Sequence, residues 1–265
     1  MKIAVTGKGG VGKTTLAAIL ARLYAAEGRK VLAVDVDPDA NLGLAIGFSR
    51  TETESVTPIA AMKELINERT GVSQNGIFQD GPGKFFKLNP RVDDIPERFS
   101  IEKNGVKLLV MGTVETGGAG CVCPEHAMVK QLLSHLVIAR DEVVIMDMEA
   151  GLEHLGRGTA SVMDRFIVVV EPGSRSIQTY DRVKSLAADL GVKKVQVAAN
   201  KIRGKEDELY FKDLIPTEDF LGFIRFNDDV LSADRRGISP FDISAEATQD
   251  IRRIKEKLEA SSEHV

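Results

Sequence analysis

The chain has 265 residues, of which 43% are hydrophobic and 28% charged, and its formal net charge is −4. This length suits one large α/β domain, and the acidic balance disfavours a dedicated nucleic-acid binder, whose surface is usually basic. No apolar run approaches the roughly 20 residues that span a bilayer. A strand pattern begins directly at the first residues, so we expect no signal peptide and a cytoplasmic protein without a membrane partner.

The first motif is the stretch from Gly7 to Thr15, which matches the phosphate-binding pattern G-x-x-x-x-G-K-[ST] without a mismatch. Residues 2–6 before it predict a buried strand, and residues 16–23 after it predict a helix. In that context backbone N–H groups and the helix N-terminus would bind phosphate oxygens. Lys13 would reach the β- and γ-phosphates, and the Thr14 hydroxyl would bind Mg²⁺. The expected nucleotide contacts are Gly9, Gly10, Val11, Gly12, Lys13, Thr14 and Thr15.

The loop sequence KGGVGKTT, from Lys8 to Thr15, resembles the deviant Walker A motif of the MinD/ParA/NifH superfamily of ATPases. The resemblance implies a mostly parallel, doubly wound α/β sheet flanked by helices, formed by a single domain over residues 1–265. It also implies a nucleotide-dependent homodimer in which Lys8 reaches the nucleotide of the partner subunit. There the lysine would act like an arginine finger supplied in trans.

Acidic residues follow the second predicted strand, over residues 30–35, where the chain reads DVDPD from Asp35 to Asp39. Ligands of open α/β sheets lie beyond the carboxyl ends of the strands, so these carboxylates would face the phosphates. In the superfamily the Asp before Pro orients the attacking water, which implies that role for Asp37. Asp35 would lie near the Mg²⁺ shell. The alternative is a polar turn at a strand end, and Asp39 has no expected role.

Residues 59–69 have the apolar spacing of a helix, after which the periodicity stops. From Gly71 to Gly105 the chain is rich in Gly, Pro and Asn without a clear pattern, which predicts an irregular insertion. The Phe85-Phe86 pair inside this insertion would either contact a partner or pack locally.

Cys121 and Cys123 are the only cysteines of the chain. They lie in a glycine-rich loop over residues 112–126, between a strand predicted over 106–111 and a helix that begins near Pro124. In a reducing cytosol such a pair fits a metal or redox site better than a disulfide, and a helix N-terminus favours the thiolate form that binds metals. The alternative is two buried small side chains.

One cysteine pair supplies two of the four ligands that a closed metal site requires. If two subunits meet face to face, their two pairs would hold one ion between them. His126, three residues after the second cysteine, is an alternative ligand within one chain.

A buried strand predicted over residues 142–147 ends in Asp147, the Walker B pattern, and this carboxylate would hold Mg²⁺ directly or through water. Residues 148–154 would then form the switch that senses the γ-phosphate. Further strands are predicted over 166–171, 195–200 and 220–224, with a helix over 176–190.

The superfamily places an adenine-reading Asn at a strand end that corresponds to Asn200, which implies nucleotide contacts for Asn200 and Lys201. A turn residue is the alternative for Asn200. The base-contacting loop of the superfamily corresponds to Arg225 and Phe226.

The C-terminal residues 247–258 predict an amphipathic helix with Ile251, Ile254 and Leu258 on one face. Acidic residues alternate with the basic ones, and no aromatic anchor is present. A membrane-surface helix would be richer in Lys and Arg, so we expect this helix to dock on the core.

The pattern GGAGCVC over residues 117–123, together with DMEAGLEHLGRGT over 147–159, resembles the CooC-type ATPases. These are nickel-insertion factors for carbon monoxide dehydrogenase, and their AcsF branch, which Glu149 and the long loop favour, serves acetyl-CoA synthase. The resemblance implies ATP or ADP, Mg²⁺ and Ni²⁺ as ligands, a homodimer that depends on ATP and metal, and one of these apo-enzymes as client. Zn²⁺ would bind the same thiolates as readily.

Two other functions stay open at this point. One is a MinD/ParA-type positioning ATPase, which would bind lipid or DNA in the presence of ATP. The other is an iron–sulfur carrier or reductase that uses the same four thiolates.

Overall fold

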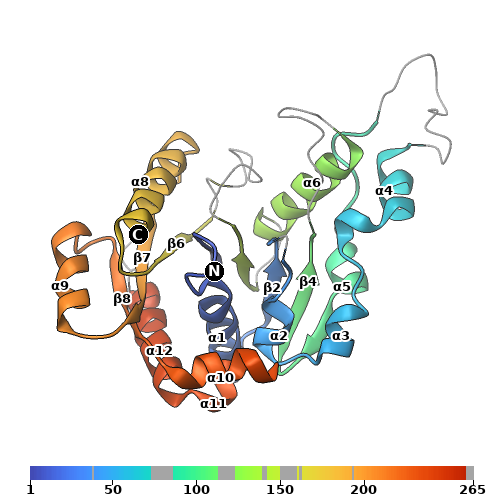
Figure 1. Ribbon diagram of the computed structural model, residues 1–265. Coiled ribbons are helices and arrows are strands. Elements are labelled where there is room, and N and C mark those ends of the chain that lie inside the picture. Colours follow the sequence, from blue (N-terminus) through green and yellow to red (C-terminus); the bar gives the residue numbers. More distant parts are fainter. Residues whose placement is uncertain are drawn as a thin grey trace.

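The computed structural model describes residues 1–37, 39–72, 86–112, 123–138, 142–149, 160, 163–192 and 194–260. An eight-stranded sheet with the order β3-β4-β2-β5-β1-β6-β7-β8 runs through its centre (Figure 1). β3 pairs antiparallel with β4, and the other pairs are parallel. The predicted fold class is therefore confirmed. The strands are β1 (Lys2–Gly7), β2 (Val31–Asp35), β3 (Ile101–Lys103), β4 (Val106–Val110), β5 (Val143–Asp147), β6 (Arg165–Val170), β7 (Val195–Ile202) and β8 (Phe220–Arg225).

Successive residues of the central strands enter two different hydrophobic layers. On β1, Ile3 and Val5 belong to one buried cluster and Ala4 to the other. On β2, Ala33 and Val34 divide in the same way. Because side chains alternate between the faces of a sheet, strands that are apolar throughout require cover on both faces.

Helices supply that cover on both faces (Figure 1). One face packs against α1 (Lys13–Ala26) and α12 (Ala245–Ala260), which also contact each other. The other face carries helices from both halves of the chain, namely α4 (Lys63–Thr70), α5 (Ile95–Phe99), α6 (Pro124–Ile138), α8 (Ser174–Asp189) and α9 (Lys205–Leu214). The other α-helices of the described residues are α2 (Leu42–Ile46), α3 (Arg50–Glu54), α10 (Asp228–Arg236) and α11 (Pro240–Ile243).

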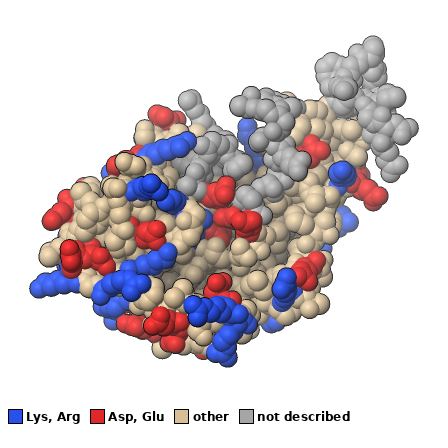
Figure 2. Space-filling model, in the orientation of Figure 1, with Lys and Arg blue, Asp and Glu red and all other residues tan. Residues whose placement is uncertain are grey.

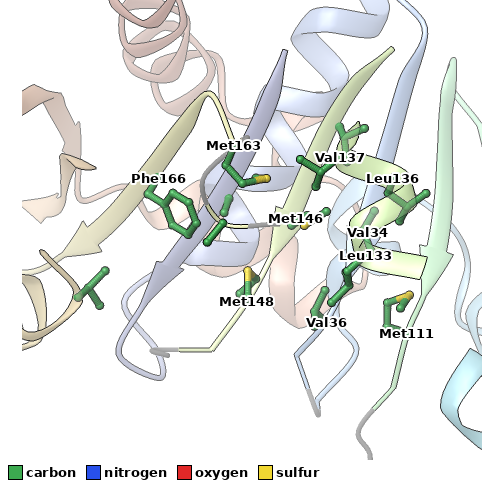
Figure 3. Packing of buried hydrophobic residues seen from close by; sticks show 14 of the residues in the cluster. Val34, Val36, Met111, Leu133, Leu136, Val137, Met146, Met148, Met163 and Phe166 are labelled. Atoms are coloured by element: carbon green, nitrogen blue, oxygen red, sulfur yellow. The ribbon is translucent and has the colours of Figure 1, made fainter. Parts of the chain in front are cut away.

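α6 is held on the sheet by one apolar stripe. Leu133, Leu136 and Val137 of this helix lie over Val34 and Met146 of the neighbouring strands (Figure 3), and all five side chains are buried. The spacing of three and four residues is that of one helix face. This packing fixes the helix whose first residue, Pro124, directly follows Cys123.

The helix predicted over residues 59–69 is broken in the structure. A 3-10 turn, η1, covers Ile59–Ala61, and α4 begins only at Lys63. Met62 between them has φ −80° and ψ 70°, which is outside the helical region. The amide of Ala60 donates to the Met111 carbonyl at 2.9 Å, so η1 is tied to the end of β4 instead of continuing into the helix.

The prediction of an irregular segment over residues 71–105 is wrong for part of its described residues. α5 and β3 lie within it, and β3 forms a hairpin with β4 through Asn104 and Gly105. Both turn residues have positive φ, 54° and 76°. Asn-Gly between two extended runs is a strong hairpin signal, so the sequence did contain the information. Phe85 lies outside the described residues.

The C-terminal helix docks on the core as predicted, since Ile251, Ile254 and Leu258 of α12 are fully buried. Asp250, which the sequence places among the outward charges of this helix, is also buried, with 2% of its surface exposed. Within the described part of the chain, none of the helices has the length and apolar character needed to cross a membrane.

Candidate functional site

A cleft of about 510 Å³ lies where β1, β2, β7 and β8 end. In a parallel sheet these carboxyl ends share one edge, which is where α/β proteins bind ligands. Eleven of the predicted site residues line this cleft together, although they come from four separate segments: Gly9, Gly10, Gly12, Lys13, Thr14, Thr15, Asp37, Asn200, Lys201, Arg225 and Phe226. Val11, also predicted, is fully buried beneath the loop.

The phosphate loop connects β1 to α1 and requires glycine at the helix start. Gly12 is the N-cap of α1 and has φ 97°, a backbone conformation that glycine adopts readily. A Cβ atom at this position would lie 2.1 Å from the side-chain amide nitrogen of Asn200. The loop is therefore pressed against the end of β7, and only glycine fits there.

Lys13 and Asp37, the predicted phosphate ligand and the predicted water-orienting residue, face each other. The Lys13 ammonium lies 3.4 Å from the Asp37 carboxylate, and both side chains are largely buried at the cleft. Each charge thus has an opposite charge within the site. Incoming phosphate would compete with Asp37 for the ammonium.

Thr14 lines the cleft and contacts the buried Asp147. The Thr14 hydroxyl donates to Asp147 Oδ2 at 2.6 Å. Asp147 Oδ1 is buried and has no hydrogen-bond partner among the described residues. Burial raises the pKa of Asp147 to about 6, although Thr14 and the Lys13 charge act in the opposite direction.

Asp35 is the register partner of Asp147 on the adjacent strand. Burial first, and then the Asp147 charge, raises the pKa of Asp35 to about 8. Its carboxylate accepts the amides of Asp37, at 3.2 Å, and Leu42, at 2.9 Å, so it shapes the loop that carries Asp37. An orphaned carboxylate oxygen beside a hydroxyl and a second carboxyl is an oxygen donor set that fits Mg²⁺.

Lys8 is exposed, and among the described residues its side chain makes no ion pair. Its backbone carbonyl accepts the Val11 amide at 3.4 Å, which closes the glycine turn. Of the predicted switch, residues 148–154, only Met148 and Glu149 are described. Glu149 lines the cleft, and its carbonyl accepts the Thr6 hydroxyl at 2.6 Å.

Asn200 and Lys201 both contact the phosphate loop. The Asn200 amide donates to the Val11 carbonyl at 2.8 Å, and the Lys201 ammonium donates to the Gly10 carbonyl at 2.8 Å. Their predicted contact with adenine stays a prediction. No local pattern in the sequence indicated the contacts to the loop, because they join residues about 190 positions apart.

Arg225 and Phe226 line the far end of the cleft and are fixed by other elements. The Arg225 guanidinium donates to Asp250 of α12 at 2.8 Å, and its amide donates to the same carboxylate at 3.0 Å. The Arg203 guanidinium lies 3.7 Å from the centroid of the Phe226 ring, a cation–π contact. Their predicted base contacts stay predictions.

One wall of the cleft was missed from the sequence. α10 and the residues after it contribute Val230, Leu231, Ala233 and Ile238. The signals for this helix were present, because Asn227 caps its start by accepting the Asp229 amide and Gly237 ends it with φ 62°.

Of the two cysteines, only Cys123 lies among the described residues. Cys121 lies outside the described residues, whereas Cys123 is partly buried and its carbonyl accepts the Ala127 amide at 3.0 Å in the first turn of α6. Within the described ranges, no cluster of three or more His, Cys, Asp or Glu side chains could hold a metal. The predicted metal site, including the role of His126, stays a prediction.

The surface charge around the cleft is mixed. On the face shown in Figure 2, Lys and Arg side chains alternate with Asp and Glu, and several acidic side chains lie together near its centre. The described residues on this face thus form no continuous basic patch of the kind that follows a nucleic-acid backbone.

Comparison with known proteins identifies the family. Residues 2–241 match the model of the CobQ/CobB/MinD/ParA nucleotide-binding domain. The carbon monoxide dehydrogenase accessory protein CooC of Rhodospirillum rubrum is 49% identical over 244 residues, which cover 92% of this chain and 90% of that protein. An uncharacterised ATP-binding protein of Methanocaldococcus jannaschii is 43% identical over 96% of both chains.

Solved structures show the same fold at low identity. MinD in the MinC:MinD complex of Aquifex aeolicus gives a TM-score of 0.66 at 20% identity, over 98% of this chain and 96% of that one. MinD of Pyrococcus horikoshii, solved with Mg-ADP, gives 0.66 at 19% identity over the same shares. The chain therefore belongs to the CobQ/CobB/MinD/ParA family of nucleotide-binding ATPases, and its sequence groups it there with the carbon monoxide dehydrogenase accessory protein CooC.

Proposed function

We propose that this ATPase carries nickel to carbon monoxide dehydrogenase or acetyl-CoA synthase and that ATP binding and hydrolysis drive the delivery. The observation that carries the proposal is the 49% identity to a carbon monoxide dehydrogenase accessory protein over 92% of the chain. The Cys-x-Cys pair that precedes α6 supplies the soft ligands that such a cargo needs.

The nucleotide end of the proposed cycle uses the residues of the cleft. Lys13 and the loop amides bind the phosphates, and Asp37 orients the water that attacks the γ-phosphate. Thr14 and Asp147, with Asp35 behind them, would hold Mg²⁺, which neutralises charge on the phosphates when it is bound. Lys8 is exposed and directly precedes Gly9, which lines the cleft, so this cation would be available to the nucleotide of a second subunit.

In the proposed cycle the metal would bind near the same edge of the sheet. β4 and β5 run parallel to β2, and α6 connects them, so its first turn lies toward the carboxyl ends of the strands. The Met111 amide donates to the Asp35 carbonyl at 2.9 Å. This hydrogen bond links the residue before the cysteine loop to the end of β2, where the acidic residues begin. We infer that a change in the nucleotide site would reach the cysteine loop through this contact.

Two thiolates from each of two subunits would complete a four-coordinate site for one Ni²⁺ or Zn²⁺ ion. In the open state each chain offers only half of the ligands, and binding should be weak. When ATP closes the dimer, the second pair becomes effectively intramolecular, which raises the affinity without any new ligand type. By linkage, the metal must then tighten ATP binding by the same factor.

The test is metal content per dimer, measured by titration of nickel with and without a non-hydrolysable ATP analogue, with thiolate-to-metal absorption and mass recorded together. We expect one ion per two chains and tighter binding with the analogue. Cys121→Ser and Cys123→Ser should each lose the ion and still bind ATP with unchanged affinity. One ion per monomer, or binding that survives both substitutions, would show that no bridging site exists.

The same samples address the remaining functions. Visible absorption from iron–thiolate bonds after anaerobic isolation would favour an iron–sulfur carrier over nickel delivery. Sedimentation with lipid vesicles or DNA in the presence of ATP would favour a positioning ATPase. The buried apolar face of α12 argues against a membrane role for that helix, because Ile251 and Ile254 have no exposed surface.

A further inference from the structure

Two residues near the end of β7 donate hydrogen bonds to two consecutive backbone carbonyls of the phosphate loop. Asn200 donates to the Val11 carbonyl at 2.8 Å, and Lys201 donates to the Gly10 carbonyl at 2.8 Å. Two neighbouring residues of one strand are thus hydrogen-bonded to two neighbouring residues of the loop. Neither contact involves a group that a nucleotide must displace, because both acceptors are backbone oxygens.

Lys201 is held in place more firmly than its partial exposure suggests. Its ammonium also donates to the Glu171 carboxylate, beyond the end of β6, at 2.7 Å. Its backbone amide donates to the Asn200 side-chain oxygen at 2.7 Å. Lys201 has φ 60°, one of only two positive-φ residues other than glycine in the described chain. A bulky residue persists in that conformation only where its surroundings determine it.

These contacts control the direction of the loop amides. In a planar trans peptide group the carbonyl and the N–H point in opposite directions. When Asn200 holds the Val11 carbonyl, the Gly12 N–H is turned away from β7. When Lys201 holds the Gly10 carbonyl, the turn that follows Lys8 and Gly9 is fixed as well.

We propose that Lys201 is a positioning residue, with Glu171 as its counter-charge, that sets the glycine turn in its phosphate-binding conformation before the nucleotide arrives. Lys201 then acts on the phosphates through the loop and does not read the base. A loop that is ordered in advance loses less conformational freedom on binding, which raises affinity. The proposal rests on nucleotide binding at this site and is independent of metal delivery.

The decisive variant is Lys201→Gly. Glycine accepts the positive φ without strain, so a merely structural lysine could be replaced with little loss, and we expect the melting temperature to fall by no more than about 4 °C. The contact to the Gly10 carbonyl is lost in this variant. Because a hydrogen bond from a charged donor is involved, we expect the dissociation constants of ATP and of inorganic tripolyphosphate both to rise roughly tenfold.

Tripolyphosphate separates the two roles because it has no base. An equal loss of affinity for ATP and tripolyphosphate supports positioning of the loop. A loss for ATP alone would show that Lys201 contacts the base, and unchanged affinity for both would show that the loop does not need it. Either result overturns the proposal.

Two further variants keep the proposal testable if Lys201→Gly folds poorly. Lys201→Arg keeps a donor and should retain ATP affinity within about threefold, whereas Glu171→Gln should weaken ATP and tripolyphosphate alike by removing the counter-charge. Failure of the wild-type chain to bind ATP would instead refute the nucleotide site itself, and that failure is visible before any variant is compared. If Glu171→Gln binds ATP with wild-type affinity, Glu171 does not act as the counter-charge of Lys201, and the proposal is overturned.

Discussion

The two ends of the cleft, which we name the phosphate end and the base end after the contacts predicted for them, are built in different ways. At the phosphate end, Lys13 and Thr14 are neighbours in one motif, and they meet Asp37 and Asp147 at the ends of two adjacent parallel strands. At the base end, Arg225 is held by a carboxylate 25 residues further along the chain, and Phe226 lies under the Arg203 guanidinium. The first end depends on a local motif and sheet register, whereas the second depends on contacts between separate elements.

This difference in construction predicts which variants change binding or turnover alone and which also change stability. Replacing Lys13 or Asp37 at the phosphate end removes a charge from the cleft and leaves the contacts of Asn200 and Lys201 with the loop carbonyls in place. Replacing a residue at the base end breaks a contact that also fastens α12 to β8. We therefore expect phosphate-end variants to change binding or turnover with little change in folding, and base-end variants to change affinity and stability together.

The largest effect on ATP binding is expected for Lys13→Ala. In our proposal the Lys13 ammonium meets the β- and γ-phosphates, and each charge-assisted hydrogen bond contributes roughly 1.5–3 kcal/mol. The dissociation constant of ATP, measured by calorimetry, should therefore rise by roughly 100-fold or more. Lys30→Ala, at an exposed lysine next to β2, is the matched control and should bind like the wild type. Undiminished ATP affinity in Lys13→Ala would contradict the assignment of the loop.

Asp37→Ala should affect turnover and spare binding. If Asp37 orients the attacking water as we propose, its loss should lower the rate of phosphate release by roughly 10²–10⁴-fold. ATP should bind at least as tightly as in the wild type, because the carboxylate that lies 3.4 Å from the Lys13 ammonium is gone. The variant should accumulate as an ATP-bound dimer.

Asp39→Ala is the control for this variant, since Asp39 lines the same cleft and is exposed. It should hydrolyse ATP at the wild-type rate. Normal phosphate release by Asp37→Ala would move the catalytic role to another residue.

Lys8→Ala should leave each subunit intact and weaken only their association. The side chain is exposed and makes no ion pair with any described residue, so the fold does not need it. If it reaches the partner's nucleotide, its loss should weaken ATP-driven dimerisation by roughly 10–100-fold, the value of one or two charge-assisted contacts. Size-exclusion chromatography with a non-hydrolysable analogue measures this, with Lys205→Ala on α9 as control. An undisturbed dimer with unchanged hydrolysis would exclude the role in trans.

The same contrast explains what the sequence could predict. Lys13, Thr14 and Asp147 were found because each stands in a contiguous pattern, a glycine loop or an apolar strand that ends in an acid. The parallel sheet was implied by the resemblance of this loop to the MinD/ParA/NifH superfamily. Asp37 was placed at the phosphates because strand ends of a parallel sheet share one edge.

The base end was predicted less completely because its contacts join distant segments. Asp250 looked like one of the outward charges of an amphipathic helix, yet Arg225 and Arg253 both pair with it, at 2.8 Å and 2.9 Å. Nothing in the local pattern of α12 indicates that partner on β8. In the same way, the hydrogen bond from Asn200 to the Val11 carbonyl depends on the order of β1, β6 and β7 in the sheet and not on any motif.

The smallest effect on binding, and the one that distinguishes the two ends most directly, is expected for Asp250→Asn. The carboxylate is 2% exposed and accepts from the Arg225 amide as well as from two guanidinium groups. The amide side chain keeps one acceptor and loses the charge, so unfolding should become easier by roughly 1–3 kcal/mol. Because Arg225 lines the cleft, the dissociation constant of ATP should rise a few-fold, and that of tripolyphosphate should not change.

Asp219→Asn is the matched control for this last variant. Asp219 lies just before the other end of β8 and accepts from Tyr180 and Lys184 at 2.7 Å and 2.6 Å, away from the nucleotide cleft. It should lose stability to a similar degree, because a shielded carboxylate again loses its charge, but it should bind ATP like the wild type. Equal ATP affinities in both variants would show that ATP binding does not depend on the position of Arg225. The two ends of the cleft would then differ in how they are built but not in how their variants behave.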